Sequence, residues 1–378
     1  MSIDLVEQIK MQEERYIGFL KNLVELESPT GHKQLVDRLI DFIYPFLIEQ
    51  KCSVTRIPRQ KYGDFLLAEW GEGRDRILLL GHVDTVWPAG TIKEFPFTIK
   101  ERIAYGPAVY DMKCGIMQFL FALKFMNDYG LRSKHKVLLL INSDEEIGSP
   151  DSEPLIKEVA LKSKYVLVGE GALSETGRLK TERSGVGLFE LKIKGIAAHA
   201  GSDPEKGASA IHEFARQVGY LESIADPASG TTINVGTVQG GTRPNVVAEN
   251  LAASIDVRFK TAGEAERIAA LLKNLHPFDP RTQIEVSGQI NRLPMERTEG
   301  NTRLFQKVKN IARSLNLALE EGSTGGMSDA NITSALGIPT LDGLGAVGGG
   351  LHARHEHLYL DHIPMRIALL VKILTEID

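Results

Sequence analysis

The sequence predicts a doubly wound, mostly parallel α/β domain with a smaller ferredoxin-like α+β domain inserted into it. Three uninterrupted apolar runs, at 77–80, 137–141 and 165–169, are typical of strands buried on both faces, as in parallel sheets. At 187–194, by contrast, apolar and polar residues alternate, which indicates a strand with one face in water. The 378 residues are also enough for two domains.

The first part of the chain alternates between predicted helices and strands. Apolar positions recur at helical spacing through 4–26 and again through 33–49, and the turn-forming run 27–31 separates the two segments. The elements predicted next are strands at 52–57, 64–70 and 76–81, a helix at 113–128, a strand at 136–141, a helix at 152–160 and a strand at 165–169. Such alternation favours a doubly wound α/β layer.

The pattern changes near residue 183. The alternating strand is followed by a predicted helix at 207–224, strands at 231–238 and 250–259, a helix at 262–276 and a strand at 282–287. This βαββαβ order is the ferredoxin-like arrangement. We therefore expect an inserted domain at 183–292, and because such inserts often pack against a second copy of themselves, we expect it to form a homodimer.

After the insert, the α/β pattern resumes. The predicted elements are helices at 301–316 and 328–336, a strand at 338–342 and a final helix at 363–377. Residues 1–182 and 293–378 together should form the larger domain, which we expect to be the catalytic, metal-binding one.

Composition excludes several classes of partner. The hydrophobic content of 43%, the charged content of 25% and the net charge of −5 are those of an ordinary globular protein and do not indicate nucleic acid as a partner. The sequence shows no signal peptide and no apolar run long enough to span a membrane. With only two cysteines, a reducing compartment is expected. We expect a cytoplasmic protein with no membrane partner.

Histidine and carboxylate residues follow the three apolar runs. His82 and Asp84 come after the first, Glu145 and Glu146 after the second, and Glu170 after the third. Ligands bind at the carboxyl ends of strands in open α/β sheets, so these side chains should share one site. Ordinary solvated loop charges are the alternative.

Two further residues join this set. Asp111 precedes a predicted helix, where it could also be a simple N-cap, and His352 follows the flexible run Gly348–Gly350. A set of imidazoles and carboxylates without thiolates suits zinc, cobalt or manganese and disfavours a structural cysteine-rich zinc site.

Together, these segments resemble the co-catalytic zinc exopeptidase family that includes glutamate carboxypeptidase of the carboxypeptidase G type, acetylornithine deacetylase and succinyl-diaminopimelate desuccinylase. The resemblance extends from Glu27–Gly31 to His352, with the motifs in the family's order. It implies a metallohydrolase with two Zn²⁺ ions per subunit, for which Co²⁺ or Mn²⁺ could substitute.

The resemblance also implies a role for each residue of the set. The metal ligands would be His82 and Glu170 for one ion, His352 and Glu146 for the other, and Asp111 as the bridge between both. Asp84 would orient the His82 imidazole. Glu145 would be the catalytic base that activates water and then protonates the leaving amine.

Further residues are candidates for contact with the substrate. By resemblance, His199 would reach the partner subunit's active site and stabilise the oxyanion, and Asn245 would lie near the substrate. Arg258 and Arg292 could grip a substrate carboxylate, since guanidinium binds carboxylate with two prongs. Backbone amides near Gly326, before a predicted helix, could do the same, although a plain helix cap explains that motif equally well.

The substrate expected from the resemblance is a small peptide or N-acyl amino acid. Within the family, residues 81–86, 142–146 and 292–294 look closest to the glutamate carboxypeptidase branch, which implies cleavage before a C-terminal acidic residue. The alternatives are an N-acyl-amino-acid deacetylase of the acetylornithine type and, more distantly, a catalytically silent binding protein. The run 343–348 resembles a dinucleotide-binding loop only weakly, because no convincing helix follows it.

Overall fold

The computed structural model describes residues 4–378, which form two compact units. The large unit comprises the chain up to Thr181, Arg297–Thr324 and Ser328–Asp378. The inserted unit comprises Glu182–Glu296 together with Gly325–Met327, so the expected insert at 183–292 lies inside it.

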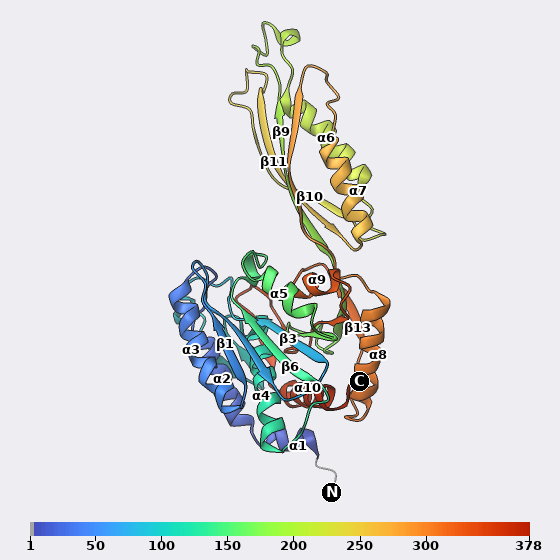
Figure 1. Cartoon of the computed structure of the whole chain (residues 1–378). Coiled ribbons are helices and arrows are strands. Elements are labelled where there is room, and N and C mark those ends of the chain that lie inside the picture. Colours follow the sequence, from blue (N-terminus) through green and yellow to red (C-terminus); the bar gives the residue numbers. More distant parts are fainter. Residues whose placement is uncertain (1–3) are drawn as a thin grey trace. The chain divides into compact units, whose positions relative to one another are not determined.

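The large unit is built on a mixed sheet with the strand order β1-β2-β6-β3-β7-β14 (Figure 1). The strands are β1 (Ser53–Ile57), β2 (Phe65–Trp70), β6 (Lys136–Asn142), β3 (Arg76–His82), β7 (Tyr165–Val168) and β14 (Thr340–Leu341). The central strand β3 runs parallel to both β6 and β7, and β14 runs parallel to β7. Strand β2 is antiparallel to both of its neighbours, β1 and β6. The predicted mostly parallel sheet is confirmed, with the three apolar runs side by side.

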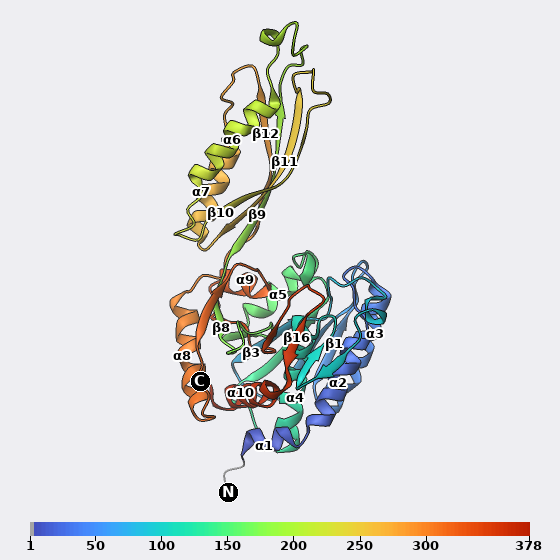
Figure 2. The same cartoon turned by 180° about the vertical axis from the view of Figure 1, so that it is seen from behind.

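Helices cover this sheet. They are α1 (Leu5–Lys10), α2 (Glu13–Glu25), α3 (Lys33–Glu49), α4 (Cys114–Asp128), α5 (Glu153–Ala160), α8 (Glu299–Arg313), α9 (Asp329–Ala335) and α10 (Ile363–Glu376) (Figure 2). Residues Ile77 to His82 of β3 are all buried, so both faces of the strand are covered. Helix α4 is buried from Cys114 to Met126, which explains why its sequence is apolar on every side.

Two elements of this unit differ in extent from the sequence predictions. The single helix predicted at 4–26 is two helices, because Gln12 leaves the helical conformation between α1 and α2. Met11 beside it is 80% exposed, whereas Ile9 in α1 and Tyr16 in α2 are buried in the same core. The strand predicted at 338–342 is only β14, a two-residue strand.

Several strands of two to five residues were not predicted from the sequence. They are β4 (Thr98–Lys100), β5 (Ile103–Tyr105), β15 (Gly348–Gly349) and β16 (His357–Tyr359) in one antiparallel sheet, and β8 (Leu179–Arg183) with β13 (Glu321–Thr324) in another. Pairing of β16 with β5 brings residues near 357 beside residues near 105. This pairing matters for the site described below.

The inserted unit has the predicted βαββαβ order. Its elements are β9 (Gly185–Lys194), α6 (Ala210–Ile224), β10 (Thr232–Gly240), β11 (Asn250–Phe259), α7 (Ala262–Lys273) and β12 (Gln283–Arg292). The strands are antiparallel in the order β10-β11-β9-β12, and both helices pack on one face of the sheet. That face holds an apolar core that includes Phe189 and Leu191. The ferredoxin-like prediction is confirmed.

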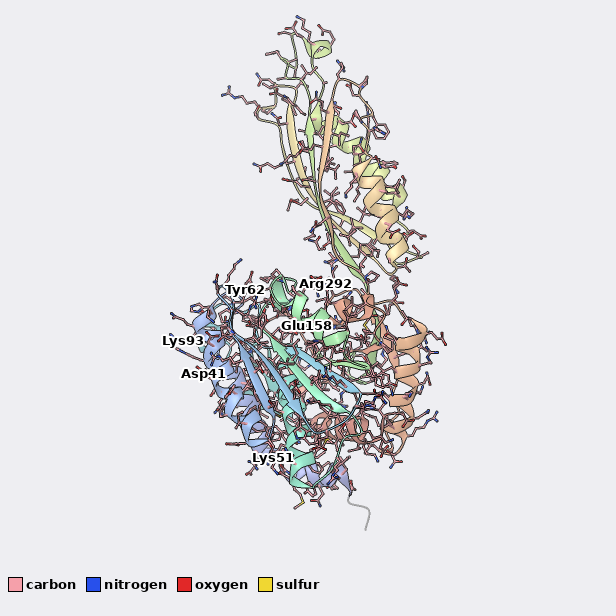
Figure 3. The ribbon with its side chains drawn as sticks, viewed as in Figure 1. Asp41, Lys51, Tyr62, Lys93, Glu158 and Arg292 are labelled. Atoms are coloured by element: carbon pink, nitrogen blue, oxygen red, sulfur yellow. The ribbon has the colours of Figure 1, made fainter. Side chains whose placement is uncertain are left out.

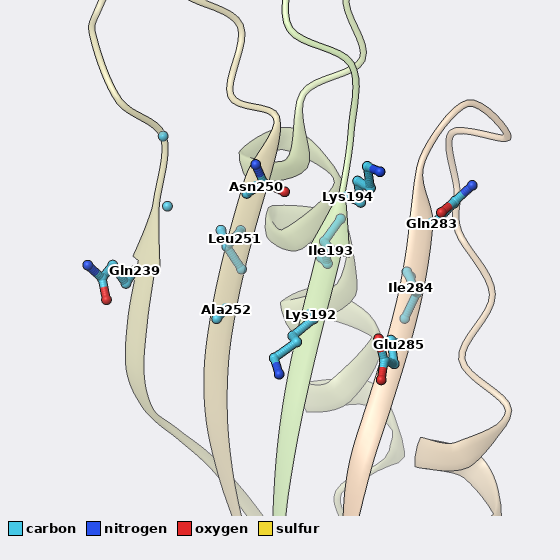
Figure 4. Close-up of a pocket in the computed structure, with 12 residues that line it drawn as sticks. Lys192, Ile193, Lys194, Gln239, Asn250, Leu251, Ala252, Gln283, Ile284 and Glu285 are labelled. Atoms are coloured by element: carbon cyan, nitrogen blue, oxygen red, sulfur yellow. The ribbon is translucent and has the colours of Figure 1, made fainter.

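A shallow hollow lies on this sheet near the ends of its strands. Its lining includes Lys192, Lys194, Asn250 and Glu285, which Figure 4 shows on neighbouring strands (Figure 4). None of the histidines of this chain lines it.

Among residues 4–378, no helix is both long enough and apolar enough to cross a membrane.

Candidate metal centre

The strand order of the large unit gathers the predicted metal-type residues at one edge of the sheet. His82 is the last residue of β3, whose neighbours on either side are β6 and β7. Glu145 and Glu146 lie in the short 3₁₀ turn that follows β6, and Glu170 follows β7 by two residues. Because parallel strands end at the same edge, these side chains converge.

One cluster of ligand atoms surrounds the His82 imidazole. Its Nε2 atom lies 3.5 Å from Asp111 Oδ1 and 3.5 Å from Glu170 Oε1. Glu145 Oε2 lies farther away, at 3.8 Å. The three carboxylates come from three separate segments of the chain.

A second cluster surrounds His352, whose side chain is 44% exposed. Its Nε2 atom lies 3.1 Å from Asp111 Oδ2 and 3.3 Å from Glu146 Oε2. The two oxygens of Asp111 therefore face different imidazoles, one on each side of the carboxylate. This is the arrangement that a bridging ligand needs.

The residues present fit divalent metal ions. Two atoms bound to one tetrahedral zinc at about 2.1 Å lie about 3.4 Å apart, which is close to the separations in both clusters. His82 Nε2 and Asp111 Oδ1 are buried and have no hydrogen-bond partner among residues 4–378, although buried polar atoms are normally satisfied. Two triads, His82–Glu145–Glu170 and His82–Asp111–Glu146, also have ligand atoms within 4.8 Å of one another.

The charges of the cluster also require compensation. Burial raises the pKa of Glu146 to about 7 and that of Glu145 well above its usual range. Hydrogen bonds to Asp111 and Glu146 raise the pKa of His352 to about 10. Burial alone would raise the pKa of Asp111, but its contacts with His352 and His82 hold that pKa below the usual range. In the protein without metal, protons on the imidazoles supply the positive charge that these carboxylates need.

Asp84 supports the cluster through its backbone as well as its side chain. Its carbonyl oxygen lies 3.1 Å from His82 Nδ1, closer than its carboxylate at 3.4 Å, so the carbonyl can orient the ring. The carboxylate accepts hydrogen bonds from the backbone N–H groups of Glu145 and Glu146, each at 3.2 Å, and from the Thr30 hydroxyl at 2.8 Å. Asp84 thus holds both the imidazole and the paired glutamates.

Glu356 is a buried residue of this region that the sequence did not single out. Its carboxylate accepts hydrogen bonds from the backbone N–H of Asp111 at 3.0 Å and from the Trp87 indole at 3.0 Å. Burial raises the pKa of Glu356 to about 7. The one signal in the sequence is an acidic residue four positions after His352, and this signal alone indicates little.

The glycine-rich run 343–348 packs against a ligand segment and does not cradle a nucleotide. The Gly345 N–H donates to the Glu170 carbonyl at 2.8 Å, and a Cβ on Gly345 would lie 2.1 Å from the Gly169 carbonyl oxygen. The buried Arg366 guanidinium donates to the carbonyls of Gly343 and Gly345. Close backbone approach explains a glycine at position 345.

His199 and Asn245 are neighbours in the inserted unit, and both are exposed. The Ala200 N–H donates to the Asn245 carbonyl at 3.0 Å, which joins their two loops. His199 Nδ1 accepts hydrogen bonds from the N–H groups of Gly201 and Ser202, each at 3.1 Å. Because Nδ1 accepts, a neutral ring carries its proton on Nε2 and presents it as a donor.

The other predicted substrate residues also belong to the inserted unit, and they differ in their surroundings. Arg258 forms a two-pronged ion pair with Asp256, at 2.8 Å for each prong, so a substrate carboxylate would have to displace that partner. Arg292 is buried at the end of β12 and is labelled in Figure 3 (Figure 3). The Gly326 carbonyl accepts a hydrogen bond from Arg183 at 3.0 Å.

The turn after Gly326 leads to a capped helix. The Ser328 hydroxyl accepts from the Ala330 N–H, and the Asn331 side chain accepts from the Ser328 N–H, which together form a capping box for α9. The plain helix cap weighed in the sequence analysis is therefore present.

Comparison with known proteins adds a family and several relatives. The model of the Peptidase family M20/M25/M40 matches residues 78–376. Carboxypeptidase G2 of Pseudomonas sp. (strain RS-16) is 29% identical over 372 residues, which cover 96% of this chain and 89% of that protein. Succinyl-diaminopimelate desuccinylase of Stenotrophomonas maltophilia (strain R551-3) is 26% identical over 320 residues, or 79% of this chain and 83% of that protein.

Solved structures share the fold. Aminopeptidase PepT from Bacillus cereus has a TM-score of 0.82 and 22% sequence identity, with 96% of this chain and 98% of that chain covered. A tripeptidase from Staphylococcus aureus has a TM-score of 0.80 and 21% identity, with the same coverage.

Proposed function

Because this chain belongs to the Peptidase family M20/M25/M40 and is a metallohydrolase, we propose that it is a carboxypeptidase that uses two metal ions. The bond it cleaves is the amide bond before a C-terminal acidic residue, with glutamate as the favoured residue, in a peptide or N-acyl amino acid. The main support is Asp111, whose two oxygens lie 3.5 Å from His82 and 3.1 Å from His352.

The proposed ligands are those implied by the two clusters. His82 and Glu170 would hold one Zn²⁺, His352 and Glu146 the other, and Asp111 would bridge them. When bound, the ions supply a Lewis acid that polarises the scissile carbonyl and lowers the pKa of the attacking water. Co²⁺ or Mn²⁺ would suit the same ligands.

Glu145 is the proposed proton carrier. Its carboxylate lies at the edge of the His82 cluster, with Oε2 3.8 Å from His82 Nε2. This distance is longer than the 3.5 Å that separates the same Nε2 atom from Asp111 and from Glu170. Burial raises the pKa of Glu145, and a base with a raised pKa both accepts a proton readily and returns it readily. Glu145 would take the proton from water and deliver it to the nitrogen of the leaving amine.

The inserted unit would supply substrate contacts and a dimer interface. His199 offers its Nε2–H to the developing oxyanion, and Asn245 lies in the adjoining loop. Arg292 and Arg258 are both candidates for the substrate carboxylate, and at Arg258 the substrate would have to displace Asp256. The exposed edge strand β10 could pair with a second copy of the chain.

A substrate panel tests the proposed activity. Zinc-loaded protein would be assayed with an N-acyl-glutamate, N-acetyl-ornithine, N-succinyl-diaminopimelate and a neutral dipeptide, and the Glu145→Ala variant would report contaminating hydrolases. We expect kcat/KM to be at least tenfold higher for the N-acyl-glutamate. Faster turnover of another substrate would overturn the glutamate preference.

A deacylase is the second candidate. The similarity to succinyl-diaminopimelate desuccinylase favours it, because the amide chemistry would be the same and only the substrate groups would differ. Preferential turnover of the N-succinyl or N-acetyl-ornithine substrate would identify it.

A further inference from the structure

Glu356 is a fully buried carboxylate that the proposed chemistry does not use. Within residues 4–378 it accepts four hydrogen bonds, two at each oxygen. Oε1 accepts from the N–H groups of Tyr110 at 2.9 Å and Asp111 at 3.0 Å. Oε2 accepts from the Ala108 N–H at 3.0 Å and the Trp87 indole at 3.0 Å. A buried carboxylate is stable only when its lone pairs are satisfied in this way.

These hydrogen bonds fix the loop that carries Asp111. The loop leaves regular structure around that residue, whose backbone is not helical, so helical hydrogen bonding does not determine its path. Three backbone N–H groups of this path, those of Ala108, Tyr110 and Asp111, instead donate to Glu356. The carboxylate replaces the hydrogen bonds that a helix would have supplied.

Glu356 also closes the turn that carries His352. The Ala353 N–H donates to the Gly350 carbonyl at 2.9 Å, and the Glu356 N–H donates to the Ala353 carbonyl at 2.8 Å. Gly350 has a φ of 77°, and a Cβ there would lie 2.8 Å from the Glu356 backbone, so the turn is tight. The backbone of Glu356 thus belongs to the His352 turn, while its side chain holds the Asp111 loop.

From this double attachment, we infer that Glu356 is a positioning residue that sets the spacing of Asp111 and His352 and thereby forms the metal position that these residues share with Glu146. The inference rests on the proposed two-metal function. Asp111 and Glu356, which join the loop to the turn, are 245 residues apart in the sequence. A direct link between the two segments is therefore needed to hold His352 Nε2 3.1 Å from Asp111 Oδ2. Preorganised ligands bind more tightly because less ordering is required on binding.

The carboxylate group suits this task better than its amide counterpart. A glutamine side chain has one carbonyl oxygen, so its NH₂ group would face two of the N–H donors that Glu356 now accepts. A shorter aspartate would keep the charge but could not reach all the donors. The two substitutions therefore separate the position of the group from its charge.

The test measures binding of Co²⁺ to metal-free protein by calorimetry and by the cobalt absorption spectrum. We compare the unchanged chain with Glu356→Gln and Glu356→Asp. The matched control is Glu213→Gln in the inserted unit, because Glu213 is also buried and accepts from the N–H groups of Phe278 and Asp279, each at 2.9 Å.

We expect the unchanged chain and Glu213→Gln to bind two ions per chain. Both Glu356 variants should keep one tight ion and bind the second at least tenfold more weakly, with a changed absorption spectrum for that ion. Two unchanged affinities in the Glu356 variants, or an equal loss in Glu213→Gln, would overturn the inference. If Glu356→Asp alone bound the second ion with unchanged affinity, the charge of residue 356 and not the position of its carboxylate would control binding. That result would also overturn the inference.

The same titration separates this inference from the proposed function. Fewer than two ions in the unchanged chain would contradict the two-metal function and the inference together, whereas two ions bound with unchanged affinity in every variant would contradict the inference alone. Should Glu356→Gln fail to fold, Trp87→Phe removes one donor to Glu356 and decides the question. It should weaken the second ion at least threefold, and no change would overturn the inference.

Discussion

The large unit buries the carboxylates that face its histidines, whereas in the inserted unit the proposed oxyanion donor His199 and the proposed substrate-binding residue Asn245 are exposed. Asp84, Asp111 and Glu170 are each at most 6% exposed. A buried carboxylate is stable only beside a compensating charge, so the large unit is organised to receive cations. An exposed histidine needs no such compensating charge, and its ring N–H is available to donate a hydrogen bond to a substrate. Substitutions in the two units should therefore impair different properties of the protein.

The largest expected effect is on catalysis in the large unit. Glu145→Ala should lower kcat by about 10²–10⁴-fold, because general base and acid catalysis contributes about that much. Metal content should remain that of the unchanged chain, since Glu145 is proposed as the base and not as a ligand. Turnover within tenfold of the unchanged chain, measured with the metal content verified, would disprove the role.

The inserted unit should show a purely kinetic defect. His199→Ala should lower kcat by about 10²–10³-fold, the usual effect of removing one oxyanion donor, with KM and metal content nearly unchanged. If His199 acts in the partner's site, mixed dimers of His199→Ala and Glu145→Ala chains should regain activity. Mixed dimers that are demonstrably formed but inactive would contradict that arrangement.

Two Gly→Ala substitutions, one in each unit, should change the free energy of unfolding in opposite directions. In the large unit, Gly345→Ala should lower the free energy of unfolding by about 1–3 kcal/mol, because the new Cβ would overlap the Gly169 carbonyl. In the inserted unit, Gly219 lies inside α6 with open space around it, so Gly219→Ala should raise that free energy by about 0.5–1 kcal/mol. Urea unfolding measures both, and equal signs would contradict the packing described for position 345.

The last expected effect is the pH dependence of metal binding to the large unit. In the metal-free protein, the pKa of His352 is raised to about 10 and that of Glu146 to about 7, so both sites hold protons that a metal must displace. Apparent affinity should therefore rise between pH 6 and 8, by about tenfold per pH unit for each proton released. Calorimetry in buffers of different ionisation enthalpy measures that release, and binding without proton release at pH 7 would contradict it.

The sequence revealed the parts of the centre that follow strands. His82, Glu145 and Glu170 each come directly after an apolar run, and adjacent parallel strands necessarily bring such residues to one edge. The geometry of Asp84 could not be predicted, because its carbonyl and carboxylate act on different neighbours. The spacing of Glu356 from His352 alone indicated little, since the burial of Glu356 results from contact with a loop 245 residues away.

The same distinction holds for the fold. Strands and helices with several turns or alternations were located closely, because burial imposes a periodicity on them. The two-residue strand β15 and the three-residue strand β16 are too short for any period, and the break at Gln12 depends on tertiary packing. Strands β15 and β16 flank the His352 turn, so the elements that position this turn were harder to foresee than the strands that precede His82, Glu145 and Glu170.

The central claim is that Asp111 bridges two metal ions. Anomalous diffraction at the zinc edge from crystals of zinc-loaded protein tests it most directly. The account predicts two zinc peaks per chain, roughly 3.5–4 Å apart, with one oxygen of Asp111 on each. A single peak, or two peaks of which only one contacts Asp111, would contradict it.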